Sequence, residues 1–273
     1  MLDPVAASGA SQPKDPSGFW DVRAFDEVDS TNTRIKEAIA QGEPEGTCFV
    51  ARRQTAAYGR QGRTWSSPEG GLYFSFILDP LGTHANAGKT LADLPALSLL
   101  LSLAVQSALA AFTGSDAIKI KWPNDILVVR AGAVGKLCGI SLEAINKKLC
   151  CGIGINISRP EASQTSVAPA ENTPAYLVDI VADSVDLDQL LSQLLVQIEG
   201  LYHAWLEQGI AQVIPEYNAQ LFNLGQAVTL EAIDGTTLYT GKVIGVSETG
   251  ELILEQQDGT RIAANSGEVH TRH

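Results

Sequence analysis

The sequence predicts an α+β protein with a mixed or antiparallel sheet flanked by helices, followed by a small β-barrel-like module. Apolar strand patterns and amphipathic helical patterns are interspersed over residues 19–221. From residue 222 onward the composition changes to frequent glycine between alternating β-forming residues. Hairpin turns are predicted there at Asp234-Gly235, Thr249-Gly250 and Asp258-Gly259. We therefore expect two domains, residues 19–221 and 222–273, behind a disordered segment of residues 1–18.

Local patterns predict each element of the larger domain. Four residues with capping side chains, Asp29 to Asn32, precede apolar positions spaced like one face of a helix, and Gly42 ends that helix. Pro-Asn-Asp at 123–125 is turn chemistry between two short strands. Strands are expected at residues 25–28, 47–52, 72–78, 117–129 (around that turn), 136–144 and 148–157. Helices are expected at residues 94–112, 187–205 and 211–221.

Charge and composition exclude several classes of protein. The 273-residue chain has a formal net charge of -12 and a pI of about 4.7. An acidic chain is a poor partner for nucleic acid, because phosphate backbones need a basic face. The most apolar stretch, residues 94–112, is interrupted by serines and a glutamine, so we expect no membrane span. The N-terminus lacks the basic start and apolar block of a signal peptide.

The four cysteines and four histidines show no metal-binding or catalytic spacing. Cys48, Cys138, Cys150 and Cys151 form no CxxC pair, and adjacent cysteines suit neither a metal nor an ordinary disulfide. We interpret them as reduced core residues, which predicts a cytoplasmic protein. No metal site is expected.

The segment RRQTAAYGRQGRTW, residues 52–65, concentrates four arginines in an otherwise acidic chain. Two of them, Arg60 and Arg63, are interleaved with glycines, which allow the backbone to move. This pattern indicates a mobile loop that closes over an anionic ligand.

Four segments, in their order and spacing, resemble the biotin–protein ligase family. They are DSTN (29–32), the stretch from Gln54 to Trp65 followed by Ser67-Pro68, KWPND (121–125), and GKLCGISLE (135–143) paired with GIGIN (152–156). The resemblance covers most of residues 25–270. One departure is in the loop, where Ala57-Tyr58 stands in place of the first Gly-Arg of the family's Gly-Arg-Gly-Arg-x-Gly-Arg. The family's DNA-binding N-terminal domain is missing, so a monofunctional ligase without a repressor is expected.

The resemblance implies a fold, a reaction and its partners. The fold would be class II synthetase-like, with an SH3-like C-terminal barrel. Biotin and ATP would be the substrates and would form biotinyl-5′-AMP and pyrophosphate, with Mg²⁺ arriving on the ATP phosphates. The biotin would then pass to a lysine of the biotin carboxyl carrier protein of acetyl-CoA carboxylase. A homodimer is left open, with the strand at residues 148–157 as a candidate edge for pairing.

Two residues are predicted to act in catalysis. Lys121 is a compact cation at a strand end, suited to lie between the biotin carboxylate and the α-phosphate, and Arg60 would close the loop over them. The predicted biotin-binding residues are Ser30, Thr31, Asn32, Gln54, Gly59, Arg60, Lys121, Gly139, Gly152 and Gly154. The predicted nucleotide-binding residues are Arg63, Trp65, Asn124, Lys136 and Asn156.

Simpler interpretations of these residues stay open at this point. Helix capping alone explains one of the residues at 30–32. Glycines in strands also mark bulges, although they permit the close approach of a flat ligand. Asp125 is better explained as a turn residue than as a metal ligand, and Trp122 stacks on a ligand or belongs to the core. At the level of function, a lipoate–protein ligase and a non-catalytic biotin sensor are the alternatives.

Overall fold

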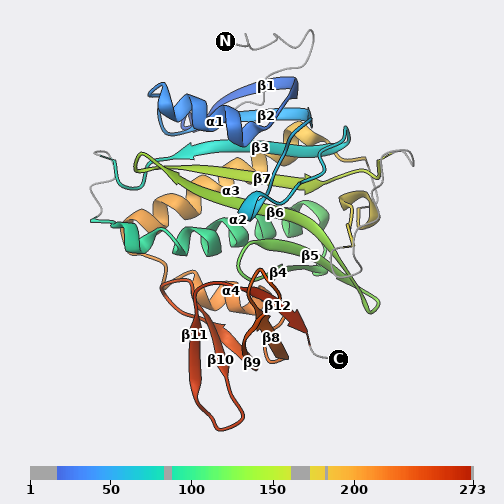
Figure 1. Cartoon of the computed structure of the whole chain (residues 1–273). Helices are drawn as coiled ribbons and strands as arrows, with labels where there is room; N and C mark the ends of the chain where they lie inside the picture. The colour runs from blue at the N-terminus through green and yellow to red at the C-terminus, as the bar shows by residue number, and fades with distance from the viewer. Residues whose placement is uncertain (1–16, 83–87, 161–172, 182–183, 272–273) are drawn as a thin grey trace.

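A computed structural model describes residues 17–82, 88–160, 173–181 and 184–271 of the chain (Figure 1). Its larger part is a seven-stranded sheet in the order β1-β2-β3-β7-β6-β5-β4. The pair β1–β2 is parallel and the other neighbours are antiparallel. The smaller part is a five-stranded antiparallel sheet in the order β11-β10-β9-β8-β12. The α+β class with a mixed sheet is thus confirmed. Closure of the second sheet into a barrel stays a prediction.

The elements lie close to their predicted positions. The helices are α1 (Thr31–Ala40), α2 (Ala96–Thr113), α3 (Leu187–Gln208) and α4 (Ile214–Gln220). The strands of the larger sheet are β1 (Asp21–Val28), β2 (Thr47–Gln54), β3 (Gly71–Leu78), β4 (Ile118–Lys121), β5 (Asp125–Arg130), β6 (Ala133–Ile145) and β7 (Lys148–Asn156). The strands of the smaller sheet are β8 (Ala227–Glu231), β9 (Thr237–Val246), β10 (Leu252–Glu255), β11 (Arg261–Ala264) and β12 (Glu268–Thr271).

The two faces of the larger sheet differ in chemistry because successive strand residues point to opposite sides. On one face, Phe74 and Phe76 of β3 and Ile153 of β7 belong to the main core with the leucines of α2 and α3. On the other face α1 packs Ile35 against Ile77 at one end of the sheet. The remainder of that face is not covered by a helix, and it is where the polar and glycine residues of β3, β6 and β7 point.

Helix α2 is a largely buried helix of the core. By length and composition this helix could cross a membrane, even though serines and a glutamine interrupt its apolar residues. In the protein, 67% of its residues are buried. The interrupting polar groups are bonded internally: Ser98 Oγ donates to the Pro123 carbonyl at 3.0 Å and Gln106 Nε2 to the Ile118 carbonyl at 3.0 Å. These bonds explain how a helix of the core carries polar residues without a desolvation penalty.

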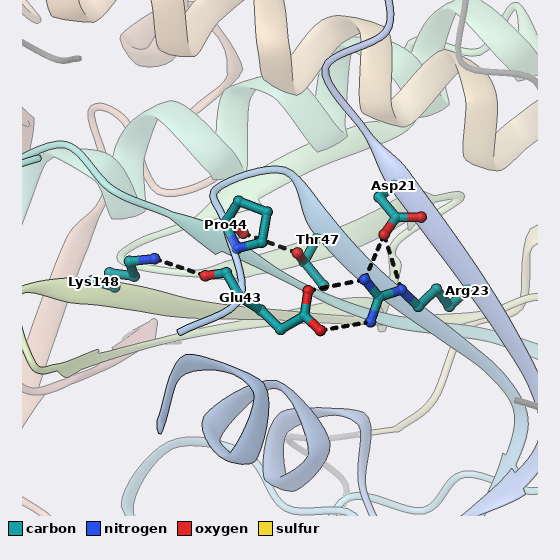
Figure 2. Close-up of polar contacts among 6 residues, drawn as sticks. All are labelled: Asp21, Arg23, Glu43, Pro44, Thr47 and Lys148. Carbon is teal, nitrogen blue, oxygen red and sulfur yellow. Dashed lines mark hydrogen bonds and ion pairs between the residues drawn. The ribbon is translucent and has the colours of Figure 1, made fainter. Parts of the chain in front are cut away.

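Strand β1 lies at one edge of the sheet and is tied by ionic contacts to the connection between α1 and β2 (Figure 2). The guanidinium of Arg23 bonds Asp21 at 2.6 Å and Glu43 at 2.9 Å. Lys148 of β7 donates to the Glu43 carbonyl at 2.7 Å. Strand β7 itself lies between β3 and β6, so the prediction that residues 148–157 form an edge for pairing with a second copy is wrong.

The two sheets meet around the KWPND turn. Trp122 is buried, and its Nε1 donates to the carbonyl of Gly250 in the β9–β10 turn at 2.9 Å. The amide of Phe222 donates to the Ile120 carbonyl of β4 at 2.8 Å. Trp122 is therefore a core residue that connects the sheets, and the predicted domain boundary at residue 222 lies in the turn-rich segment between α4 and β8.

The burial of all four cysteines gives a test of the core. Each is a buried free thiol, and burial raises the thiol pKa of each, in the case of Cys150 to about 12. A raised pKa keeps a thiol protonated and unreactive. We therefore expect Ellman's reagent at pH 8 to titrate none of the four thiols in the folded protein and all four in guanidinium chloride. Rapid reaction of even one native thiol would contradict the buried positions.

Candidate ligand-binding site

A cavity of about 420 Å³ opens on the sheet face that α2 and α3 leave uncovered. Every residue predicted for the site from the sequence lines it. From strand ends, turns and the start of α1 come Ser30, Thr31, Asn32, Gln54, Gly59, Arg60, Arg63, Trp65, Lys121 and Asn124, and from β6 and β7 come Lys136, Gly139, Gly152, Gly154 and Asn156. The structure thus brings together segments that are far apart in the chain; the role of each residue stays a prediction.

Strand register orders the floor of this cavity into rows. Ser75 pairs with Gly152, and Gly152 with Ser141, which gives a row of small polar and glycine residues next to α1. The next row along the strands runs from Tyr73 through Gly154 and Gly139 to Asp125. Across the floor, the lining therefore changes from the hydroxyl groups of Ser75 and Ser141, through glycines, to the carboxylate of Asp125.

The polar end of the cavity is a connected set of hydrogen bonds at the start of α1. Thr31 Oγ1 lies 2.7 Å from Ser75 Oγ, and Gln54 Oε1 accepts from the Thr31 amide at 2.7 Å. Asn32 accepts from Ser75 Oγ at 2.6 Å and donates to Ser141 Oγ at 3.1 Å. All these side chains except Gln54 are buried, and burial of polar groups is tolerated because they satisfy one another.

Helix capping explains only one residue of the DSTN segment. Ser30 is the N-cap of α1, and its Oγ accepts from the Thr33 amide at 3.5 Å. Thr31 and Asn32 instead point across the sheet face to β3 and β6. Their side chains are therefore available to shape a binding site as well as the fold.

The strand glycines make room for side chains of the protein itself. A Cβ placed on Gly152 would overlap Asn32 Oδ1, so this glycine is required by the polar network. A Cβ on Gly154 would lie 2.6 Å from Trp65 Nε1, and one on Gly139 would lie 3.0 Å from the same indole. The Trp65 indole thus covers the glycine row, and its buried Nε1 has no hydrogen-bond partner among the described residues.

The far end of the cavity is charged. Lys136 Nζ lies 2.8 Å from Asp125 and 5.3 Å from the Trp65 ring centroid. Asn156 Nδ2 donates to the Lys136 carbonyl at 3.1 Å. Lys121, in contrast, has no hydrogen-bond or ion-pair partner within the described part of the chain, although it lines the cavity. It is the cation left free to meet an anionic ligand.

The arginine-glycine segment forms an ordered strap across this cavity, here called the ligand loop (residues 55–66). Its ends are joined by the bond from the Trp65 amide to the Ala57 carbonyl at 3.1 Å. Arg60 Nη1 donates to Asn124 Oδ1 of the KWPND turn at 2.8 Å, and Arg63 pairs with Glu268 of β12. Partial burial lowers the pKa of Arg60, and Asp125 opposes that effect. The guanidinium stays charged at neutral pH.

Several lining residues were not anticipated from the sequence: Tyr58, Tyr73, Ser75, Ser141, Tyr176 and Glu268. The sequence does contain a sign of two of these residues, because Ser75 and Ser141 are polar residues within largely apolar strands. Alternation in β3 puts Ser75 opposite to the phenylalanines of the main core, so a hydroxyl in that position must find a polar partner. Glu268 carries no such signal, because it reaches the cavity from the second sheet.

Comparison with known proteins identifies the family. Residues 24–158 match the sequence profile of the biotin/lipoate A/B protein ligase family, and residues 224–271 match that of the biotin protein ligase C terminal domain. The chain is 30% identical over 243 residues to a biotin--[acetyl-CoA-carboxylase] ligase of Paracoccus denitrificans, covering 86% of this chain and 94% of that protein. The chain belongs to the biotin/lipoate A/B protein ligase family.

Further relatives agree with this assignment. The bifunctional ligase/repressor BirA of Bacillus spizizenii is 30% identical over 240 residues, which cover 86% of this chain and 70% of that protein. The biotin protein ligase of Aquifex aeolicus, solved in complex with biotin and ATP, superposes with a TM-score of 0.75 at 32% identity. That superposition covers 92% of this chain and 98% of the other. The second sheet therefore belongs to the fold of the ligase family.

The Gly152–Asn32 contact yields a prediction for stability. We expect Gly152→Ala to lower the free energy of unfolding by about 1–3 kcal/mol, because the methyl group forces Asn32 out of its network. The control is Gly200→Ala in α3, where an added Cβ meets nothing within 4 Å. That change should stabilise the protein by roughly 0.5–1 kcal/mol through helix propensity. Urea denaturation of both variants decides the point, and equal stabilities would contradict the described packing.

Proposed function

We propose that the cavity binds biotin and ATP side by side, with Lys121 between their reacting groups. The chain is a biotin–protein ligase, which activates biotin as biotinyl-5′-AMP and transfers it to a lysine of a carrier protein. The observation that carries the proposal is the order of the cavity lining: hydroxyls and amides at one end, glycines beneath the Trp65 indole in the middle, and unpaired Lys121 with Arg60 at the other.

The ureido ring of biotin fits the polar end. A cyclic urea has two N–H donors and one carbonyl acceptor, and each left unpaired on burial would cost about 1–3 kcal/mol. Thr31, Asn32 and Ser75 offer hydroxyl and amide groups held at fixed positions by their bonds to one another. The valeryl chain would then run along the Trp65 indole, which covers the glycine row, and direct the biotin carboxylate toward Lys121.

The triphosphate fits the charged end of the cavity. Arg63 and Lys136 are cations of the wall, and Asn124 and Asn156 add amide groups. Trp65 offers an aromatic face for the adenine. We expect ATP to bring Mg²⁺ on its phosphates and waters, because Asp125 and Glu268 are engaged in ion pairs and no cluster of three metal-ligating residues occurs in the described ranges.

The chemistry needs charge neutralisation and alignment more than proton transfer. A carboxylate oxygen of biotin attacks the α-phosphorus, a new P–O bond forms, and the bond to the leaving pyrophosphate breaks. Lys121 would lower the repulsion between these two anions, and the ligand loop would exclude water from the resulting acyl phosphate. An amine of the carrier lysine then attacks the acyl carbon, an amide forms, and AMP leaves.

The partners and compartment are also proposals. The carrier is the biotin carboxyl carrier protein of acetyl-CoA carboxylase, in agreement with the name of the Paracoccus denitrificans relative, a biotin--[acetyl-CoA-carboxylase] ligase. A cytoplasmic location is supported by four free, buried thiols. Lipoate is the alternative substrate; the match of residues 224–271 to a biotin-specific C-terminal domain favours biotin.

The role of Lys121 is tested with a matched lysine on the same strand. We expect Lys121→Ala to lower the rate of biotin-dependent pyrophosphate release by about 10²–10³-fold, the loss typical of one charge-stabilising donor. Lys119→Ala should retain the rate, because Lys119 bonds Gln220 at 3.0 Å and does not line the cavity. Pyrophosphate release by Lys121→Ala within a few-fold of the wild type would remove this lysine from the mechanism.

The role of Arg60 is tested by the fate of the intermediate. Arg60→Gly removes the bond from the ligand loop to Asn124, so biotinyl-5′-AMP should escape and modify lysines of bystander proteins. Streptavidin blotting after incubation with bovine serum albumin measures this, with Arg52→Ala as the control. Arg52 is exposed and lies 3.6 Å from Asp26, outside the cavity. A variant that labels albumin no more than the control would argue against closure by Arg60.

A further inference from the structure

Tyr58 stands where the family pattern has an arginine, and it contacts a residue pair outside the ligand loop. Lys36 Nζ of α1 lies 4.9 Å from the centroid of the Tyr58 ring. The same ammonium group pairs with the carboxylate of Glu143 on β6. The three residues thus connect the loop, the helix and the sheet.

This cluster lies just beyond the polar end of the cavity. Glu143 is two residues along β6 from Ser141, so both point to the same face. Lys36 is four residues along α1 from Asn32, hence one helical turn away on the same side. Tyr58 itself lines the cavity and is half-buried. Burial lowers the pKa of Lys36, but Glu143 and Tyr58 outweigh that effect and raise the pKa overall.

The other side-chain anchors of the ligand loop lie at the charged end. Arg60 bonds Asn124, and Arg63 pairs with Glu268. At the polar end, two backbone bonds hold the base of the loop: the Thr55 amide donates to the carbonyl of Val28 at the end of β1 at 3.0 Å, and the Ala56 amide to that of Asp29 at 2.8 Å. Beyond the base of the loop, the side chain of Tyr58 attaches the loop to α1 through its contact with Lys36.

We propose that Tyr58, Lys36 and Glu143 form a latch that holds the ligand loop over the polar end of the cavity before any ligand binds, and that slows the escape of ligand from that end. The latch rests on the proposed function in one respect, because the escaping ligand is taken to be biotin. Tyr58, Lys36 and Glu143 are positioning residues, since they act through the loop.

The chemistry of the cluster explains why an aromatic residue stands at this position. An aromatic face attracts a nearby ammonium group, whereas an arginine at position 58 would place a second cation beside Lys36. Glu143 holds Lys36 in place through their ion pair, and the other carboxylate oxygen of Glu143 is buried with no hydrogen-bond partner among the described residues. Restoring the arginine of the family pattern should therefore open the latch.

The first test measures the loop without ligand, by hydrogen–deuterium exchange of the amides of residues 57–65. We expect Tyr58→Arg and Lys36→Met each to speed this exchange by roughly ten-fold, which corresponds to about 1.4 kcal/mol. Tyr58→Phe keeps the ring and should exchange like the wild type. The control is Lys148→Met, which removes another half-buried lysine that bonds the α1–β2 connection (Figure 2). Global unfolding midpoints of these variants report whether any change is confined to the loop.

The second test measures biotin dissociation by stopped-flow, with the tryptophan fluorescence of the protein as the signal, since Trp65 and Trp122 line the cavity. The latch predicts that dissociation speeds up roughly ten-fold in Tyr58→Arg and Lys36→Met and stays unchanged in Tyr58→Phe and Lys148→Met. Unchanged loop exchange in both Tyr58→Arg and Lys36→Met would overturn the latch, as would unchanged dissociation from a wild-type protein that binds biotin. Failure of the wild type to bind biotin would instead overturn the proposed function, and the exchange measurement would still decide whether the latch holds the loop.

Discussion

The register of strands β3, β7 and β6 is the constraint on which the site depends. It pairs Ser75, Gly152 and Ser141 in one row and Tyr73, Gly154 and Gly139 in the next. A shift by one residue would turn these groups into the core and expose the phenylalanines of β3. The same alternation that buries the apolar residues against α2 and α3 therefore delivers a polar, glycine-lined floor on the opposite face. The lining of the cavity and the hydrophobic core are two consequences of one arrangement.

The roof of the site depends on contacts between the ligand loop, the KWPND turn and the second sheet. The ligand loop reaches the KWPND turn through Arg60 and the second sheet through Arg63. Trp122, within the same turn, donates to the β9–β10 turn of the second sheet. The second sheet therefore buttresses the charged end of the cavity. Loss of that sheet would affect the charged end of the cavity before the polar end.

Much of the fold and the site follows from the sequence, for identifiable reasons. Glycine-containing turns and the capping residues at 29–32 are local signals, so the hairpins and the start of α1 could be placed in advance. Local signals do not say which strands are neighbours, and for this reason the sequence suggests an edge strand at residues 148–157, although β7 is central. Local signals also do not show which side chains meet across the fold. Only the structure shows that Gly152 makes room for Asn32 and that Asp125 pairs with Lys136. The latch around Tyr58 depends on a helix, a loop and a strand, and only the folded chain brings them together.

Activation of biotin in this cavity is tested most directly by isotope exchange between radiolabelled pyrophosphate and ATP in the wild-type protein. This exchange reports the reversible formation of an acyl adenylate without any carrier protein. We expect exchange that requires both biotin and Mg²⁺ and does not occur when lipoate replaces biotin. Exchange with lipoate alone would contradict the assigned substrate. Tight binding of biotin without any exchange would contradict catalysis and leave a protein that only senses biotin.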